Sequence, residues 1–316
     1  MTTSIDCTQI YLHVGYPKTA TTWLQNDIFP YHDGFFLISN RYKLTDWGTH
    51  LVSAHSLEFD ADYVRDTVLQ TAKAVGKTKI LISWDHLLGD SSYHADHLTE
   101  LAQRLYQCFP NACVTLYLRE QIGLLKSLYA QYIQEGGTWL LADFIRLKYP
   151  YRAGFNPVYL HYDKVIECYS QLFSREKIYV GFYERLKAQP ATELAELFAW
   201  MGLAEDQQLV HRVPKTYNVS LSRQSLALLR LMNHLVPSRF NSFGPALFRR
   251  QPRSRFYLRK VMQEYIDPYL IRKIFSQCDI TMPAELESHL YIYYQQVNEK
   301  LSEHLSVDLA AYGYII

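Results

Sequence analysis

Short apolar runs alternate with longer amphipathic stretches over the first two thirds of the chain. Apolar, β-rich runs predict buried strands at residues 10–14, 79–83, 112–118 and 178–182. Between them, apolar residues recur at helical spacing and predict helices over residues 22–29, 62–75, 94–108, 122–134 and 158–173. Strands separated by long helices pair in parallel through right-handed crossovers, which place helices on both faces of the sheet. The pattern therefore predicts a three-layer α/β fold with a parallel sheet.

From about residue 221 the pattern changes to one helix after another. Apolar residues at helical spacing predict helices over residues 222–235, 256–269 and 286–305. We therefore expect a core over residues 1–220 and a helical extension over residues 221–316 that packs on the core as part of one domain. The arginine-rich residues 249–255 predict either a solvated loop or a contact for an acidic acceptor or an anionic lipid surface.

The composition is typical of a soluble globular protein with balanced charge. The chain has 316 residues, of which 48% are hydrophobic, and its 32 Lys and Arg face 31 Asp and Glu. This balance argues against bulk binding of nucleic acid. No apolar run is long enough to span a membrane, and the N-terminus has no apolar signal core. The five cysteines are scattered without a C-x-x-C pair, so we expect reduced thiols in a cytoplasmic protein.

The clearest chemical signal follows the first predicted strand, where residues 14–24 read V-G-Y-P-K-T-A-T-T-W-L. A strand that ends in such a turn and continues as a helix directs backbone N–H groups and the positive end of the helix dipole at one point. Lys18 adds a full charge, and Thr19, Thr21 and Thr22 add hydroxyl donors. The segment therefore predicts a loop that binds a phosphate-like anion.

The spacing within this loop distinguishes two kinds of anion site. A nucleoside triphosphate P-loop has the pattern G-x-x-x-x-G-K-[ST], whereas Gly15 lies three residues before Lys18 and no second glycine follows. The segment instead resembles the 5′-phosphosulfate loop of the sulfotransferases that use 3′-phosphoadenosine 5′-phosphosulfate (PAPS), which commonly reads Y-P-K-[ST]-G-T-T-W. The resemblance implies a P-loop-like fold and a PAPS-binding loop formed by Pro17, Lys18, Thr19, Ala20, Thr21, Thr22 and Trp23.

Ala20 is the one departure from this loop pattern, because the family commonly has glycine there. A Cβ penalises a positive φ, so we expect Ala20 to hold the loop only with a negative φ. The resemblance also implies a catalytic role for Lys18, which would neutralise charge on the transferring group.

A second segment supports the same family. The predicted strand 112–118 ends in Arg119, and Ser127 follows eight residues later in a predicted helix. By the resemblance, Arg and Ser at this spacing bind the 3′-phosphate of PAPS. The chemistry fits, because arginine can grip a phosphate with two parallel N–H bonds and two helical turns bring the serine back to the same side.

A third segment, residues 178–186, reads I-Y-V-G-F-Y-E-R-L and precedes Pro190 and a helix that ends in W-M-G-L. The family often has a strand ending in Y-E-[DR]-L before such a helix. By the resemblance, Tyr183 lies near the adenine and Trp23 stacks against it; the alternative for each ring is the apolar core. The resemblance covers residues 9–203 in order.

The base that takes the proton of the acceptor hydroxyl is expected at the end of the strand 79–83, which runs into Asp85 and His86. Bacterial members of the family often have an acidic residue at this position, Golgi-type members use glutamate, and cytosolic members use histidine. Neighbouring residues at a strand end point opposite ways, so one of the two faces the cleft. We favour Asp85, and His86 stays open as the alternative.

These residues predict a PAPS-dependent sulfotransferase that transfers a sulfuryl group in line to a hydroxyl of a glycan, lipid or secondary metabolite. No metal is expected, and the pair His94 and His97 lacks a third ligand. Two other functions stay open: a metal-dependent nucleotide kinase with a degenerate P-loop, in which Thr19 would bind Mg²⁺, and a non-catalytic anion-binding protein of the same fold. We expect a small-molecule or glycan acceptor, with no nucleic acid partner and no transmembrane segment.

Overall fold

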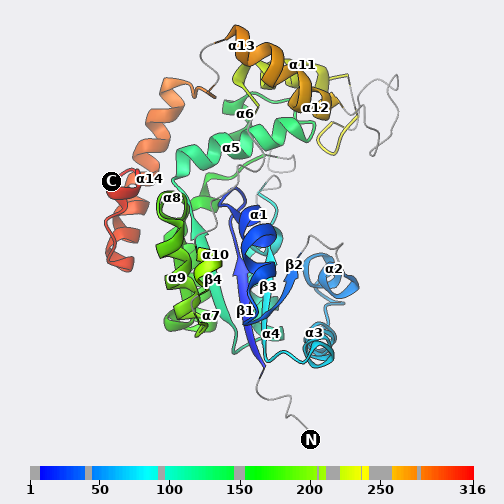
Figure 1. Ribbon diagram of the computed structural model, residues 1–316. Helices are drawn as coiled ribbons and strands as arrows, with labels where there is room; N and C mark the ends of the chain where they lie inside the picture. Colours follow the sequence, from blue (N-terminus) through cyan, green and yellow to red (C-terminus); the bar gives the residue numbers. More distant parts are fainter. Residues whose placement is uncertain are drawn as a thin grey trace, which may run out of the picture.

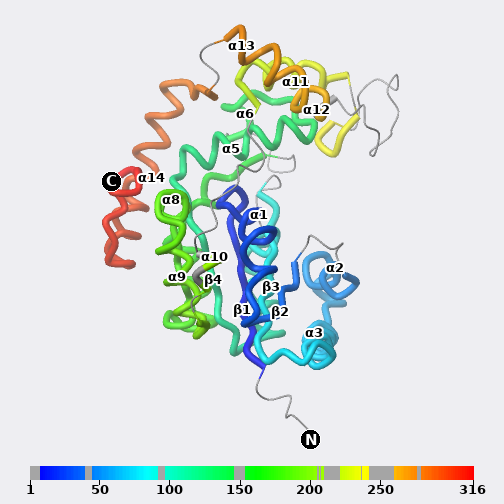
Figure 2. Tube along the Cα trace, viewed as in Figure 1, coloured from blue at the N-terminus to red at the C-terminus, as the bar shows by residue number. Residues whose placement is uncertain are grey.

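A central sheet with helices on both faces forms the body of the molecule, and Figure 1 shows further helices beyond one end of the strands. The chain trace in Figure 2 runs from the blue sheet strands to the orange and red helices of the C-terminal third. The computed structural model describes residues 8–39, 45–91, 97–145, 154–204, 206–210, 221–235, 237–241, 258–275 and 279–316.

The sheet has the order β2-β3-β1-β4-β5, and all neighbouring strands are parallel. The predicted α/β fold with its parallel sheet and the four predicted strands are confirmed. The strand β2 was not predicted, because it has only four residues and too few positions for a periodic signal. The strands are β1 (Gln9–Val14), β2 (Phe36–Ser39), β3 (Lys79–Trp84), β4 (Cys113–Leu118) and β5 (Ile178–Phe182).

Helices that follow β1 and β5 pack on one face of the sheet. They are α1 (Thr21–Trp23), the π-helix η2 (Leu24–Ile28), the 3-10 helix η3 (Phe29–Tyr31), α8 (Tyr183–Ala188) and α9 (Pro190–Trp200), with α10 (Gln207–Val210) beyond. Those that follow β2, β3 and β4 join the core of the other face. They are α2 (Asp46–Ser53), α3 (Ala61–Val75), η4 (Asp85–Leu88), α4 (Leu98–Cys108), α5 (Gln121–Gln134), α6 (Leu141–Ile145), η5 (Pro157–Leu160) and α7 (Tyr162–Phe173). The 3-10 helix η6 (Arg175–Lys177) has no buried residue and connects α7 to β5.

Three predicted helices differ in detail from the structure, and one of them is the stretch 256–269, whose described part is α-helical over Leu258–Val261 and a π-helix over Met262–Ile271. The stretch predicted as one helix over residues 22–29 changes from α to π to 3-10, which a 3.6-residue period cannot reveal. The helix predicted over residues 158–173 consists of η5 and then α7, because His161 between them has φ −77° and ψ 77°.

The strands supply side chains to two separate apolar cores, because successive residues of a strand point to opposite faces. Leu12 of β1, Ile82 of β3 and Leu116 of β4 belong to the larger core. Tyr11 and Tyr117 belong to the smaller core on the other face. The strands are therefore buried on both sides, which explains why they read as continuous apolar runs.

The C-terminal third is helical, as predicted, and Figure 1 shows most of its helices beyond α5. The buried amides of Gln121 at the start of α5 and Asn298 bond to each other, and Asn298 also donates to the carbonyl oxygen of Ile315 at 2.9 Å. The boundary expected between residues 220 and 221 stays a prediction, since residues 211–220 lie outside the described part. The helices are α11 (Arg223–Asn233), α12 (Leu258–Val261), the π-helix η8 (Met262–Ile271), α13 (Arg272–Ile274), α14 (Ala284–Leu305) and the 3-10 helix η9 (Leu309–Tyr312).

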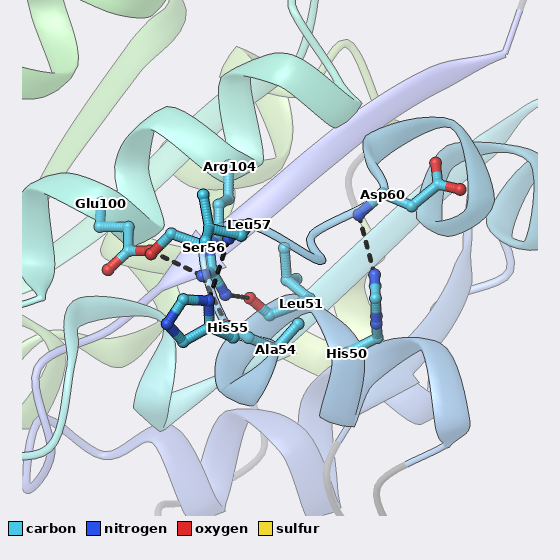
Figure 3. Close-up of polar contacts among 9 residues, drawn as sticks. All are labelled: His50, Leu51, Ala54, His55, Ser56, Leu57, Asp60, Glu100 and Arg104. Atoms are coloured by element: carbon cyan, nitrogen blue, oxygen red, sulfur yellow. Dashed lines mark hydrogen bonds and ion pairs between the residues drawn. The ribbon is translucent and has the colours of Figure 1, made fainter.

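A buried arginine fastens α2 to α4, as Figure 3 shows. Arg104 of α4 donates to the carbonyl oxygens of Leu51 at 3.0 Å and Ala54 at 2.7 Å, and to the Glu100 carboxylate at 2.6 Å. These carbonyls lie at the C-terminal end of α2, where the last carbonyl groups of a helix have no N–H partner within the helix. The same helix carries Trp47, whose ring stacks 5.4 Å from that of Trp84 at the end of β3.

We predict that Arg104→Met lowers the free energy of unfolding by about 1–3 kcal/mol, because the two carbonyls lose their donor while staying covered. The measurement is urea denaturation followed by circular dichroism. Arg65→Met is the control: its ion pairs with Asp62 and Asp66 are largely exposed, and such pairs contribute about 0.2–1 kcal/mol. Equal losses in the two variants would contradict the anchoring role.

Candidate functional site

Hydrogen bonds from buried hydroxyl groups hold the loop after β1 in place. Tyr16 is fully buried and donates through its hydroxyl to the carbonyl oxygen of Tyr159 at 2.9 Å. Thr19, also fully buried, donates to the carbonyl oxygen of Tyr16 at 2.6 Å. Pro17 and Lys18 are partly exposed at the top of the turn. The side chain of Thr19 therefore holds the loop in shape from within.

Ala20 corrects one expectation from the sequence, because its φ is +64° and not negative. It forms the N-cap of α1 in the left-handed region, and Lys18 has a φ of +67°. Left-handed turns of this kind point successive N–H groups the same way and create a concave anion site. The loop shape requires this conformation at both positions, and Ala20 adopts it at a cost of roughly 1–2 kcal/mol.

Arg119 and Tyr183 come together beside this loop, although they follow different strands. The Arg119 guanidinium lies 4.5 Å from the centre of the Tyr183 ring. Its Nη1 donates to the carbonyl oxygen of Lys18 at 2.9 Å. The backbone of Arg119 is held in turn by the Tyr162 hydroxyl, which donates to the Arg119 carbonyl oxygen at 2.6 Å. Arg119 therefore meets the anion loop directly, and Tyr183 is joined to it through Arg119.

Two carboxylates that the sequence analysis did not single out lie close to Arg119. Glu184 accepts a hydrogen bond from the backbone N–H of Glu120 at 2.9 Å, and burial raises the pKa of its carboxyl. Glu120 caps α5 and accepts from the N–H groups of Ile122 and Gly123. The N-terminus of α5 is thus occupied by its own capping carboxylate. Arg119 is the cation that offsets this negative charge.

Asp85 and His86 differ in their surroundings at the end of β3. Asp85 is half-buried and receives a long hydrogen bond of 3.4 Å from Gln25 Nε2. Burial raises the pKa of Asp85, while His86, Lys18 and the Gln25 hydrogen bond act in the opposite direction. His86 is exposed. The Asp85 carboxylate therefore interacts electrostatically with Lys18 of the anion loop, whereas the His86 side chain is exposed.

The remaining predicted residues occupy varied positions. The Thr21 hydroxyl and the Trp23 Nε1 are buried without a hydrogen-bond partner among the described residues. The Trp23 side chain is 3% exposed and packs in the smaller core, so its stacking on adenine stays a prediction. Thr22 and Ser127 are half-buried, and Ser127 lies on α5 eight residues after Arg119. His94 and residues 249–255 lie outside the described part.

The remaining expectations from sequence concern the cysteines, metal ligands and membrane-spanning helices. Cys108, Cys113 and Cys168 are free thiols. Within the described ranges, no three His, Cys, Asp or Glu side chains gather in a way that would hold a metal ion. The same ranges contain no helix with the length and apolar character needed to cross a bilayer.

Neither a protein-family model nor a curated protein sequence matches the chain. Solved structures do match: a sulfotransferase from Alicyclobacillus acidocaldarius aligns with a TM-score of 0.56 and 13% identity, over 96% of this chain and 97% of that one. The chain has the sulfotransferase fold. The resemblance inferred from the loop is confirmed at this level.

Two further solved structures match with lower scores. One is a sulfotransferase domain from the curacin biosynthetic pathway, with a TM-score of 0.42 and 10% identity over 95% of this chain and 98% of that one. The other is a mouse sulfotransferase complexed with PAP, with a TM-score of 0.39 and 14% identity over 90% of this chain and 83% of that one. The assignment of the sulfotransferase fold to this chain rests on the Alicyclobacillus structure.

We predict that Ala20→Gly raises the free energy of unfolding by about 0.5–1 kcal/mol. Relief of the left-handed strain exceeds the extra freedom that glycine gives the unfolded chain, which costs about 0.4–1 kcal/mol. Urea denaturation measures the change. The matched control is Ala227→Gly at an exposed position inside α11, which should instead lower stability by about 0.8–1 kcal/mol. A loss at both positions would show that Ala20 is unstrained.

Proposed function

We propose that the chain is a PAPS-dependent sulfotransferase that transfers a sulfuryl group to an acceptor hydroxyl. One observation carries the proposal: Arg119, from the strand next to β1, donates at 2.9 Å to the backbone of Lys18 in a loop with the PAPS-loop sequence. The two segments that would hold the 5′-phosphosulfate and the 3′-phosphate are thus in direct contact. The sulfotransferase fold supports the same conclusion.

The polar groups of the loop fit an anionic nucleotide. Lys18 and Ala20 have left-handed conformations suited to directing N–H groups at an anion, and the Thr21 hydroxyl is buried without a described partner. When bound, PAPS would supply the sulfuryl group. Lys18 would neutralise charge near the loop, Arg119 and Ser127 would bind the 3′-phosphate, and Tyr183 would lie beside the adenine.

Asp85 is the better candidate for the base. It is half-buried and electrostatically coupled to Lys18, whereas His86 is exposed. Because burial raises the pKa of Asp85, its carboxylate is a stronger base than an ordinary exposed aspartate. It would accept the proton of an acceptor hydroxyl brought to the loop. The acceptor class remains a hydroxyl of a glycan, lipid or secondary metabolite.

A nucleotide kinase is a weaker alternative, because its Mg²⁺ would need the hydroxyl that follows the loop lysine. That hydroxyl belongs to Thr19, which is fully buried and already donates to the carbonyl oxygen of Tyr16. A non-catalytic anion-binding protein would need the anion loop but has no use for a half-buried carboxylate that interacts with Lys18. Ligand preference and the behaviour of Asp85 variants distinguish these functions.

The first test compares ligands with and without a 3′-phosphate. We expect PAP, the desulfated product of PAPS, to bind more tightly than adenosine 5′-phosphate. Arg119→Ala should weaken the binding of PAP about tenfold to a hundredfold, because a charge-assisted hydrogen bond contributes about 1.5–3 kcal/mol. The same variant should have little effect on the binding of adenosine 5′-phosphate. Isothermal calorimetry measures both. The control is Arg175→Ala, which removes an arginine bonded to Ile178 at the start of β5. Preference for ATP with Mg²⁺ over PAP would favour the kinase.

The second test concerns the base. We expect Asp85→Asn to lower kcat by about 10²–10⁴-fold while PAP affinity is unchanged, because asparagine cannot take a proton. His86→Ala should lose much less. In the wild type, kcat should fall on acidification with a midpoint above the ordinary carboxyl pKa of 3.8. An active Asp85→Asn with an inactive His86→Ala would assign the base to His86.

The same variant has a stability readout with a defined sign. A carboxyl whose pKa is raised by folding stabilises the protein below its unfolded pKa, and this stabilisation is lost as the pH rises through the folded pKa. Ionised Asp85 therefore lowers stability at neutral pH. Asp85→Asn should melt at an equal or higher temperature than the wild type at pH 7, so its inactivity would not come from unfolding.

A further inference from the structure

A buried chain of hydrogen bonds lies beneath the anion loop. His13 of β1 and Ser83 of β3 are opposite each other in the parallel register, and both are fully buried. His13 Nδ1 lies 2.7 Å from Ser83 Oγ. Gln25 Nε2, from the π-helix η2, lies 2.9 Å from Ser83 Oγ, 3.0 Å from the Ser83 carbonyl oxygen and 3.4 Å from Asp85 Oδ1. None of these three residues belongs to the PAPS-loop pattern.

The direction of the Gln25 hydrogen bonds follows from their acceptors. The Gln25 nitrogen faces Ser83 and Asp85, because the amide oxygen cannot bond to a carbonyl or a carboxylate. Ser83 Oγ thus accepts from Gln25 and shares a second hydrogen bond with His13 Nδ1, its other partner among the described residues. Burial lowers the pKa of His13 to about 4, so the ring is neutral.

His13, at one end of this series of hydrogen bonds, lies close to the start of the anion loop. A Cβ added to Gly15 would lie 3.2 Å from His13 Nε2 and 3.3 Å from Thr21 Oγ1. Gly15 thus permits the imidazole to approach the loop backbone closely. The hydrogen bonds themselves run from His13 to Asp85 across the paired strands β1 and β3, and His13 packs closely against Gly15 at the start of the loop.

We propose that Gln25 is a positioning residue that holds the Asp85 carboxylate beside the anion loop through this chain. The inference rests on the proposed function, in which Asp85 is the base. The amide can donate to a carboxylate but cannot take a proton from it, so it orients Asp85 and favours the ionised form. The bonds to Ser83 hold the amide itself in place.

Other groups around Asp85 act differently from Gln25. Lys18 from the loop and His86 from η4 lower the pKa of Asp85 through their charge. Tyr159 from η5 also interacts electrostatically with Asp85, and burial keeps the pKa of its phenol far above the usual range, so it stays neutral. Gln25 is the neutral hydrogen-bond donor of this set.

The test replaces the donor without changing the length of the side chain. In Gln25→Met, we expect the titration midpoint of Asp85 to rise by about half a pH unit. Carbon-13 NMR of the side-chain carboxyl in the ligand-free protein measures it, with the signal assigned by its loss in Asp85→Asn. The control is Gln9→Met, the same exchange at the opposite end of β1, where Gln9 bonds to Asn111. Gln9→Met should leave the midpoint unchanged.

The NMR titration needs neither PAPS nor transfer, so it tests the positioning role even if the proposed function fails. An unchanged Asp85 midpoint in folded Gln25→Met overturns the proposal. Should that variant not fold, Gln25→Glu keeps the shape and brings a second carboxylate close, which must raise the midpoint further; an unchanged midpoint there also overturns it.

Kinetics separate positioning of Asp85 from a general effect on the loop. In Gln25→Met, we expect kcat at pH 7 to fall about three- to tenfold, the acid limb of its pH profile to move upward with the NMR midpoint, and KM for PAPS to stay within twofold. A rise in KM with unchanged kcat would mean that Gln25 acts on the loop and would overturn its role as the residue that positions Asp85.

Discussion

The site depends on the parallel pairing of β1 with β3 on one side and with β4 on the other. Parallel strands end at the same edge of a sheet, and ligands in such folds bind beyond that edge. Because of this pairing, Lys18, Asp85 and Arg119 follow three adjacent strands and meet at one place. The contact between Arg119 and the Lys18 backbone exists only because β1 and β4 are neighbours.

Burial on both faces of the sheet has a chemical consequence at this edge. The buried polar side chains of His13, Ser83 and Gln25 lie next to the smaller core around Tyr11 and Tyr117. These groups bond to one another and leave few polar atoms to water, so each keeps a single arrangement. A rigid polar layer therefore separates the apolar interior from the surface that would meet the ligand, which favours preorganised catalysis.

Much of this architecture follows from local sequence. The strands are continuous apolar runs, and the loop, Arg119 and Tyr183 each stand directly after one, so their convergence could be predicted. The edge strand β2 could not, because four residues contain no period. Nor could the φ of Ala20, since an alanine signals a negative φ and only the assembled loop imposes the opposite.

Residues linked through distant partners were also beyond sequence reasoning. Gln25 lies within a segment predicted as an ordinary helix, and nothing near it in sequence indicates that it contacts Ser83 and Asp85. The π turn of η2 and the pairing of β1 with β3 create that contact. Glu184 is similar, because its partner Glu120 follows another strand. Such residues are recognised only when the sheet order is known.

An aromatic cluster beneath the loop joins segments that are distant in sequence. Tyr162 holds the Arg119 backbone and packs 5.0 Å from Tyr16, and the Tyr314 ring lies 6.5 Å from that of Tyr162. Tyr314 also contacts Phe182 at the end of β5. The loop, Arg119 and the end of β5 therefore share one block of packed rings, although they lie far apart along the sequence. A substitution that loosens Tyr314 would be transmitted through Tyr162 to both the Arg119 backbone and Tyr16.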